Sequence, residues 1–428
     1  MIRWILVPVA AAIVAVALVP PEPLVAQNQK KNQRKGGLET ANPAYATVTV
    51  RLTADPSGRP AKPVGFIHPG VLVNRAQLDE IKKRVAAGTE PQKTSFEALK
   101  RSPLAALDYA PNPRDTVECG SNSNPDLGCK AEQADSDAAY SQALMWYITG
   151  NKAYAANAIR IMNAWSSTLT GGHTNNNGPV QASWTGDVWP RAAEIIRYSN
   201  AGWSDADIAK FQNMLRTQYL PFVVHGTCEN GNKELTMAEA IVNIGVFLDD
   251  RTVFDFGVKM WRGRAPAYIY LKSDGAAPVE APDCGQAIWG NKGITPQFVE
   301  GLLQESYRDS QHAALAFAGM VDAAETARQQ GLDLYAEQGT RIMAAMEFQA
   351  QYLPPNSAPP PPNLEFNLHP TWEIAYNHFH NRLGMELPKM ARVIGANRPT
   401  GVNHHMAWET LTHGDIGKVG IPPVKAAN

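Results

Sequence analysis

The segment Glu305–His312 carries ionisable side chains at a spacing that suits catalysis. It reads Glu-Ser-Tyr-Arg-Asp-Ser-Gln-His and opens a long apolar pattern with helical spacing, so we expect the segment itself to be helical. On a helix, Glu305, Arg308 and His312 stand at positions i, i+3 and i+7 and project from one face. Three ionisable groups beside an apolar run favour a cleft, although a solvated helix face has the same pattern.

Two further segments place polar and aromatic side chains where a substrate can be held. Asn232 stands at a predicted helix start, where its side chain is either a helix cap or an amide donor aimed at a substrate carboxylate. A polar loop at 174–179 leads to Gln181, Trp184 and Trp189, which suit the rim of a sugar-binding site. Two core tryptophans that follow a turn would produce the same pattern.

The C-terminal part of the chain is rich in histidine. Five of the ten histidines lie between 378 and 413. A metal site is one interpretation, but it needs ligands on one helix face, such as a His pair at i and i+4, and the closely spaced pairs here lack that spacing. We therefore expect neither a metal nor another cofactor. The residues that favour a polar, substrate-binding cleft are Tyr376, His378, His404 and His405.

An arginine, an asparagine, histidines and a tyrosine together suit the removal of a carbon-bound proton next to a carboxylate. That proton is a very weak acid, so the carboxylate must first be neutralised, and we assign this role to Asn232 and Arg308. His312 or an ionised Tyr376 then removes the proton, and the Tyr376 hydroxyl protonates the leaving glycosidic oxygen. These steps amount to β-elimination in a uronic-acid polymer, so the expected partner is an acidic polysaccharide.

Two other functions are compatible with the sequence. A glycoside hydrolase needs two carboxylates in a cleft, and Asp187, Glu239 and Glu305 are the candidates. A protein that binds polyuronate without cleaving it is the other alternative, because one fold hosts many functions. The chain contains no GxSxG nucleophile elbow, no P-loop and no dinucleotide-binding fingerprint, which excludes the classes that depend on these motifs.

The elements that must position these residues are helical almost throughout. Apolar residues recur with a helical period, and short turns divide the helices into antiparallel pairs. Such a chain forms a superhelical solenoid or a closed ring, and we favour the ring because no repeat period is visible. We predict an all-α (α/α) toroid, an incomplete barrel of antiparallel helical hairpins in a single catalytic domain. The predicted helices cover residues 74–88, 91–101, 131–149, 152–169, 182–199, 204–218, 234–249, 251–271, 296–329, 331–353, 371–383, 386–394 and 402–411.

The N-terminal residues have the pattern of a secretory signal. A positively charged start is followed by an apolar run at 4–19 and by a small-residue stretch that ends at Ala26. We divide the chain into a signal peptide (1–26), a flexible polar leader (27–64) and a toroid lyase domain (65–428). We expect a periplasmic or secreted protein without stable membrane insertion after signal cleavage, although an uncleaved anchor would start in a similar way.

Charge and cysteine content narrow the class further. The chain has 39 Lys and Arg against 40 Asp and Glu, so it has no overall basic charge with which to attract a nucleic acid. Four cysteines in an exported chain indicate disulfides. Cys119 and Cys129 bracket a loop rich in Gly, Asn and Ser, and we expect them to pair, which leaves Cys228 with Cys284. Four cysteines allow two other pairings.

Six short motifs connect the chain with a known family. They are spread over residues 68–417 and comprise Gly231–Met237, Phe247–Asp250, Pro266–Tyr270, Glu305–His312, Trp372–His378 and His404–Thr410. With these motifs the chain resembles the alginate-lyase-like polysaccharide lyases that have an (α/α) toroid. The resemblance implies cleavage of alginate, or of a related polyuronate such as glucuronan, outside the cytoplasm and without a cofactor.

The chain also departs from that resemblance at two positions. The better-known alginate lyases place an Asn-His pair before one helix and, later, an Arg seven residues ahead of a Tyr. Asn232 and Arg308 match this pattern, but Lys233 stands where the His is expected and Leu315 where the Tyr is expected. The residues that transfer protons must therefore come from elsewhere, and the candidates are His312, Tyr376 and His378.

Overall fold

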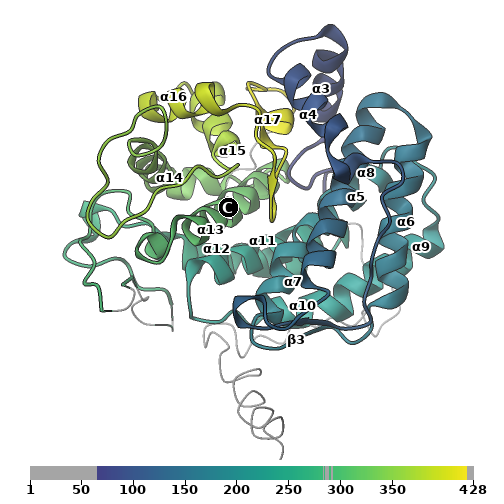
Figure 1. Ribbon diagram of the computed structural model, residues 1–428, viewed down its shortest axis with the longest axis horizontal. Coiled ribbons are helices and arrows are strands. Elements are labelled where there is room, and N and C mark those ends of the chain that lie inside the picture. The colour runs from purple at the N-terminus through teal and green to yellow at the C-terminus, as the bar shows by residue number, and fades with distance from the viewer. Residues whose placement is uncertain (1–64, 283, 285–288, 291–292, 422–428) are drawn as a thin grey trace, which may run out of the picture.

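The protein is built from helices that follow one another around a ring (Figure 1). The computed structural model describes residues 65–282, 284, 289–290 and 293–421. The predicted signal peptide (1–26) and leader (27–64) lie outside the described residues. The α-helices in the described part are α3 (Arg75–Ala87), α4 (Gln92–Arg101), α5 (Cys129–Thr149), α6 (Lys152–Thr168), α7 (Gly178–Gly186), α8 (Val188–Arg197), α9 (Asp205–Met214), α10 (Leu220–Val223), α11 (Gly231–Phe247), α12 (Arg251–Tyr268), α13 (Ser310–Gln329), α14 (Leu334–Ala350), α15 (Glu373–Tyr376), α16 (Pro388–Asn397) and α17 (Glu409–His413).

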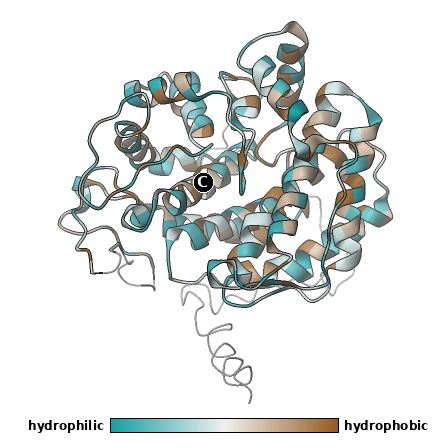
Figure 2. Ribbon diagram, viewed as in Figure 1, coloured by the Kyte–Doolittle hydropathy of each residue, from teal (hydrophilic) through white to brown (hydrophobic). Residues whose placement is uncertain are grey.

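These helices form an inner and an outer layer. Nearly every residue of α11 and α13 is buried, whereas α6, α12 and α14 bury one face and expose the other. Helix α11 packs against α12, α13 and α7, and α5 packs against α6 and α8. Hydrophobic and hydrophilic residues alternate along the helices at the edge of the molecule (Figure 2), as expected for helices that bury one face.

The two ends of the described chain meet. Helix α17 packs against α3 and α4, and Figure 1 shows these three helices side by side. The side chain of Asn74, just before α3, donates hydrogen bonds to the Gly420 carbonyl and to Oε1 of Gln329. The ring is therefore closed by contacts between its first and last elements. Within the described ranges, no helix has the length and apolar character needed to cross a membrane.

Side-chain caps set the starts of the two helices that lead into the candidate site. Asn230 caps α11, because its Oδ1 accepts a hydrogen bond from the Lys233 N–H at 3.0 Å. Asp309 caps α13 in the same way, through the His312 N–H at 2.8 Å. Asn232 is not the cap of its helix, so its side chain is available for another role.

The Asp309 cap also corrects one predicted helix. The helix expected over 296–329 begins only at Ser310, because Asp309 has extended backbone angles (φ −172°, ψ 162°). Just before it, Gln304–Tyr307 form a separate 3₁₀ turn, η6. Glu305 and His312 therefore do not share one continuous helix.

Two further predicted helices have a different form. The helix expected over 182–199 divides at Asp187 into α7 and α8. The segment 402–411 instead forms a small hairpin of β4 (Val402–Asn403) and β5 (Met406–Ala407), followed by α17. The chain at 402–411 turns back on itself where a helix was expected, and this turn carries His404 and His405 to the inside of the ring.

The remaining strands form a three-stranded sheet beside α7. β1 (Val117–Cys119) lies in the middle, antiparallel to β2 (Asp126–Leu127) and parallel to β3 (His173–Thr174).

Disulfides join Cys119 to Cys129 and Cys228 to Cys284, and both predicted pairings are confirmed.

His68 links the start of the described chain to two acidic residues. Its Nδ1 lies 2.9 Å from Glu194 Oε2 and its Nε2 lies 2.9 Å from Asp249 Oδ1. Its ring also stacks on Tyr198, with centroids 4.3 Å apart. Burial alone lowers the pKa of His68, but hydrogen bonds and charges from Asp249 and Glu194 outweigh burial and raise the pKa to about 9.

Loss of the proton from His68 should lower the free energy of unfolding by up to about 3 kcal/mol between pH 6 and pH 10. The size follows from the raised pKa of His68, because each unit of difference between the folded and unfolded pKa contributes about 1.4 kcal/mol. The folded pKa of His68 is raised above the ordinary value of 6.5, so this stabilisation is complete below pH 6.5 and is lost as the pH rises through about 9. Urea unfolding of the wild type and of His68→Gln at pH 6 and pH 10 measures this pH-dependent part of the free energy of unfolding. His380→Gln, which alters a histidine on the surface, is the control; equal pH dependence in wild type and His68→Gln would contradict the prediction.

Candidate active site

The carboxylate of Glu305 connects the two residues predicted to bind a substrate carboxylate. Its side chain is only 3% exposed. Oε2 accepts a hydrogen bond from the Asn232 N–H at 2.8 Å, and Oε1 accepts one from Arg308 Nη1 at 2.9 Å. Burial raises the pKa of Glu305, and the charge that His312 carries when protonated, together with that of Arg308, opposes part of that rise. Glu305 therefore fixes the start of α11 and the guanidinium of Arg308 relative to each other.

Arg308 remains accessible although it is held at one end. Its side chain is 43% exposed, and its Nε lies 3.9 Å from Asp309 Oδ2. Among the described residues, its Nη2 has no hydrogen-bond partner. An arginine that is fixed through one nitrogen and open at another is suited to bind an incoming carboxylate.

His312 is oriented by the residue that caps its helix. Its Nδ1 lies 2.7 Å from Asp309 Oδ2. Burial alone would raise the pKa of Asp309. Hydrogen bonds from His312 outweigh burial and lower the pKa to about 2, so the carboxylate is ionised. An ionised carboxylate only accepts hydrogen bonds, so Nδ1 of His312 carries a proton and Nε2 of the neutral ring has a free lone pair. The His312 side chain is 26% exposed, so the ring is not enclosed by the core.

Trp184 on α7 lies across the site from these residues. Its Nε1 donates a hydrogen bond to Oδ1 of Asn232 at 3.3 Å. This contact occupies the amide oxygen of Asn232 and leaves the Nδ2 group as the donor for a ligand. The half-buried indole packs against Leu315 and Met406, and its ring meets His404 edge-to-face at 5.0 Å.

The tip of the β4–β5 hairpin brings His404 into the site. His404 has a φ of 52°, a left-handed value that suits the first position of a two-residue hairpin turn. Its Nδ1 lies 2.8 Å from Asn403 Oδ1, and the next residue, His405, is anchored through Nε2 to the Leu315 carbonyl at 3.1 Å. Burial, together with the charge that His312 carries when protonated, lowers the pKa of His404 to about 4, so the His404 ring is neutral at pH 7.

Two residues predicted to bind substrate lie elsewhere. Gln181 is buried, and its Nε2 donates hydrogen bonds to the Cys129 carbonyl at 3.0 Å and to Glu132 Oε2 at 2.8 Å. Trp189 is 0% exposed, and its Nε1 donates a hydrogen bond to the Tyr219 hydroxyl at 2.9 Å. Both are enclosed by the core, because their polar atoms already have partners there, so neither contacts the cluster around Arg308.

Three residues from the histidine-rich region are also enclosed. His378 stacks on Tyr335 with centroids 3.9 Å apart, and burial lowers its pKa to about 3. Tyr376 stacks on His380 at 4.7 Å, and burial raises its pKa. His405 is 0% exposed beneath the hairpin tip. No contact within the described chain joins these side chains to Arg308 or His312, so His404 is the histidine of this region that the structure brings into the cluster.

The carboxylates considered for hydrolysis do not form a cleft pair. Asp187 and Glu239 are both 0% exposed, and Arg191 Nη2 lies 2.5 Å from Glu239 Oε1 and 3.9 Å from Asp187 Oδ1. Glu305 is committed to Asn232 and Arg308. These three carboxylates therefore do not supply the pair of cleft carboxyl groups that hydrolysis requires.

Sequence reasoning missed two residues beside His312. Asp309 orients the imidazole, and its signal was present in the sequence as an acidic residue three positions ahead of a histidine at a helix start. His369 lies with its Nε2 3.2 Å from Ser310 Oγ, at the start of α13. It belongs to an irregular segment in which no helical or strand period marks its position.

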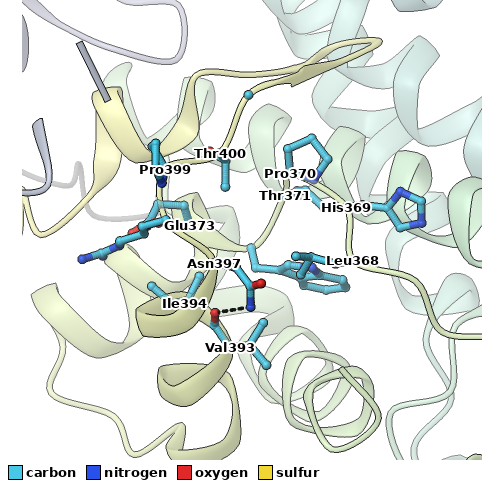
Figure 3. Close-up of a pocket in the computed structure, with 13 residues that line it drawn as sticks. Leu368, His369, Pro370, Thr371, Glu373, Val393, Ile394, Asn397, Pro399 and Thr400 are labelled. Atoms are coloured by element: carbon cyan, nitrogen blue, oxygen red, sulfur yellow. Dashed lines mark hydrogen bonds and ion pairs between the residues drawn. The ribbon is translucent and has the colours of Figure 1, made fainter. Parts of the chain in front are cut away.

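His369 also lies at the edge of a small cavity. The cavity of about 210 Å³ is formed between the segment 368–373 and α16, and Figure 3 shows His369 pointing away from Val393 and Ile394 on its opposite wall. The cavity lining contains neither Arg308 nor His312, so it is separate from the cluster described above.

Comparison with known proteins identifies the fold and the family. Residues 79–359 match the alginate lyase family. A Tyr-to-Phe variant of alginate lyase A1-III complexed with tetrasaccharide has a TM-score of 0.57 at 16% identity, over 81% of this chain and 97% of that chain. Alginate lyase A1-III from Sphingomonas species A1 has a TM-score of 0.54 at 14% identity, over 83% and 99%. An alginate lyase from Bacteroides ovatus has a TM-score of 0.50 at 14% identity, over 81% and 99%.

A shorter similarity points elsewhere and covers little of the chain. The small ribosomal subunit protein bS16c of Thalassiosira pseudonana is 33% identical over 78 residues, which is 18% of this chain and 92% of that protein. By contrast, the solved lyases share the helical ring over most of both chains, so the fold is an (α/α) toroid, as predicted. The chain belongs to the alginate lyase family, a family of polysaccharide lyases, and the predicted resemblance is confirmed.

Proposed function

We propose that the protein cleaves a uronic-acid polymer by β-elimination at the cluster around Arg308. The observation that supports this most directly is the shared carboxylate of Glu305, which holds the Asn232 backbone at 2.8 Å and the Arg308 guanidinium at 2.9 Å. Two donors that can neutralise a substrate carboxylate are thereby held near His312, whose Nδ1 is bound to Asp309.

In the first step, Arg308 and Asn232 bind the carboxylate at C5 of a uronate ring. Arg308 offers its open Nη2 group, and Asn232 offers Nδ2 because Trp184 already occupies its Oδ1 at 3.3 Å. These donors stabilise the negative charge that moves onto the carboxylate when the C5 proton leaves.

In the second step, Nε2 of His312 takes the C5 proton. The electron pair of the broken C–H bond forms the C4–C5 double bond, and the bond from C4 to the glycosidic oxygen breaks. The ionised Asp309, 2.7 Å from Nδ1, stabilises the imidazolium that results. His312 then returns the proton to the leaving oxygen, so one residue serves as base and acid.

The remaining residues form the walls of the site. Trp184 presents a half-buried ring on which a sugar can stack, and the neutral His404 lies against its edge. Tyr376, the proton donor predicted from the sequence, is the alternative acid, but its neighbours in the structure are His380 and the residues around Arg398.

The proposed proton path also favours certain substrates. A single base that also acts as the acid needs the C5 proton and the C4 oxygen on the same face of the ring. D-mannuronate and D-glucuronate have that relation, whereas L-guluronate does not. The tetrasaccharide complexes described for alginate lyase A1-III fit a site that takes an oligomer. Two disulfides favour a periplasmic or secreted location for this reaction.

The test is to incubate the purified protein with polymannuronate, polyguluronate and glucuronan and to follow the ultraviolet absorbance of the unsaturated product. We expect signal with polymannuronate or glucuronan and a much weaker signal with polyguluronate. No absorbance change with any polyuronate, across pH 5–9 and several oligomer lengths, would refute the proposal.

The same experiment separates the alternatives. A glycoside hydrolase would shorten the polymer and produce reducing ends without ultraviolet absorbance. A binding protein would leave the chain length unchanged while it retained affinity for the polymer. Size-exclusion chromatography of the products, together with a reducing-end assay, distinguishes these outcomes from lyase action.

A further inference from the structure

A second cluster of buried polar groups lies beneath the hairpin tip. It consists of Asp187 at the junction of α7 and α8, Glu239 on α11, and His405 on the β4–β5 turn, all 0% exposed. One potential ligand atom from each of the three lies within 4.8 Å of the others. We infer that these three residues bind a divalent transition-metal ion that ties the hairpin tip to α7, α8 and α11.

The first argument is that the other atoms of these side chains are already occupied. His405 Nε2 lies 3.1 Å from the Leu315 carbonyl, so it carries the proton and leaves Nδ1 as a lone pair. Glu239 Oε1 accepts a hydrogen bond from Arg191 at 2.5 Å, which leaves Oε2. No donor group within the described chain reaches His405 Nδ1, Glu239 Oε2 or either carboxylate oxygen of Asp187. The Asp187 and Glu239 carboxyl groups lie close enough to share a proton, and the ion would take the place of that proton.

The second argument concerns charge. Arg191 Nη2 forms ion pairs with Glu239 at 2.5 Å, Asp322 at 3.0 Å and Asp187 at 3.9 Å. These three carboxylates and one guanidinium carry two excess negative charges in a site that excludes water, which is unfavourable. One divalent cation would offset these two charges. The buried Asp137, whose charge also acts on Arg191 and Asp187, adds a further negative charge when it is ionised. Without the ion, protons must take its place on the buried carboxyl groups.

The ligand types select the class of ion. One neutral imidazole and two carboxylates suit zinc, manganese or iron, whereas calcium and magnesium prefer sites made only of oxygen atoms.

Such an ion would act on the hairpin rather than on a substrate. Arg191 Nη1 also donates a hydrogen bond to the His405 carbonyl at 2.8 Å, so the turn is already held from the same side. The ion would add a bond from the His405 ring to helices α7 and α11. Because His404 immediately precedes His405, its position in the candidate active site would depend on the ion.

The test begins with the wild-type full chain. The metal content of the purified protein is measured by inductively coupled plasma mass spectrometry, and the protein is then stripped with a chelator and titrated with Zn²⁺, Mn²⁺, Ca²⁺ and Mg²⁺. We expect one ion per chain and a higher Tm with Zn²⁺ or Mn²⁺ than with Ca²⁺ or Mg²⁺. A wild-type protein that contains no transition metal, and whose Tm none of these ions changes at millimolar concentration, would overturn the inference.

Variants locate the site. Asp187→Asn and His405→Gln should each lower affinity for the ion at least about tenfold. Glu132→Gln is the matched control, because Glu132 is also a buried carboxylate beside a histidine, with its Oε1 2.9 Å from His173 Nε2. Unchanged affinity in a folded Asp187→Asn variant would refute the site. If both ligand variants fail to fold, the test rests on the wild-type protein: its metal content per chain, and the change in its Tm when metal is added back after chelation. None of these measurements uses a polyuronate, so they remain decisive if the proposed lyase activity is absent.

Discussion

Replacing Arg308 with alanine is expected to lower kcat/KM on a polyuronate by about 10²–10³-fold, the range found when one donor to a developing negative charge is removed. The Arg308 guanidinium is 43% exposed and is held by Glu305, so its loss opens no cavity in the core. The variant should therefore stay folded, with a Tm lowered only by the loss of the ion pair to the buried Glu305 carboxylate. Steady-state rates from product absorbance, together with thermal unfolding, measure both quantities.

Two further variants define the role of this arginine. Arg308→Lys keeps the charge but loses the planar fork of donors, so we expect a loss smaller than that of Arg308→Ala but still clear. Arg262→Ala is the control, since Arg262 is 47% exposed and pairs with Glu337 on the surface. Wild-type rates in Arg308→Ala would show that Arg308 does not bind the substrate carboxylate, and this conclusion would not depend on the Arg262→Ala control.

Replacing His312 with alanine is expected to lower kcat by about 10²–10⁴-fold, the usual contribution of a positioned acid or base. The loss should fall mainly on kcat, because His312 is assigned to proton transfer and Arg308 and Asn232 to binding. Asp309→Asn is the more selective variant. Asparagine also caps helices well, so α13 should remain intact while the negative charge that stabilises the imidazolium is lost.

Tyr376→Phe tests the other proton path. If His312 both removes and returns the proton, the Tyr376→Phe variant should have wild-type rates, because the Tyr376 ring packs against His380 away from the cluster. A kcat loss as large as that of His312→Ala would instead assign the acid to Tyr376. Unchanged kcat in His312→Ala would contradict the assignment of His312 as the base.

The helical ring could be predicted because its cause is local. Apolar residues at helical spacing determine which segments are helices, and short turns determine that neighbours are antiparallel. The error at 296–329 also has a local cause: Asp309 caps α13 and breaks the pattern that continues through it. Arg308 and His312 still lie close together, because both side chains lie beside the Asp309 carboxylate, at 3.9 Å and 2.7 Å from its Oδ2.

The rest of the candidate site depends on contacts between distant parts of the chain. Nothing local distinguishes Trp184, which meets His404 at 5.0 Å, from Trp189, whose ring is enclosed by the core. In the same way, two adjacent histidines have opposite environments, because the tight turn points His404 towards Trp184 while His405 is held beneath by Leu315. These differences in burial and contacts between neighbouring residues arise only when distant parts of the chain meet as the ring closes.

The closure of the ring has a consequence for the order in which the enzyme can become active. Trp408 Nε1 donates a hydrogen bond to Ser141 Oγ at 2.8 Å, across 267 positions of sequence, and Asn74 reaches Gly420 across 346. Contacts of such separation form late, since a long loop must close first. A chain still emerging from a ribosome or a secretion channel lacks the His404 hairpin, so it has an incomplete site until its last helices are in place. Cleavage by the proposed mechanism would thereby be confined to the finished molecule.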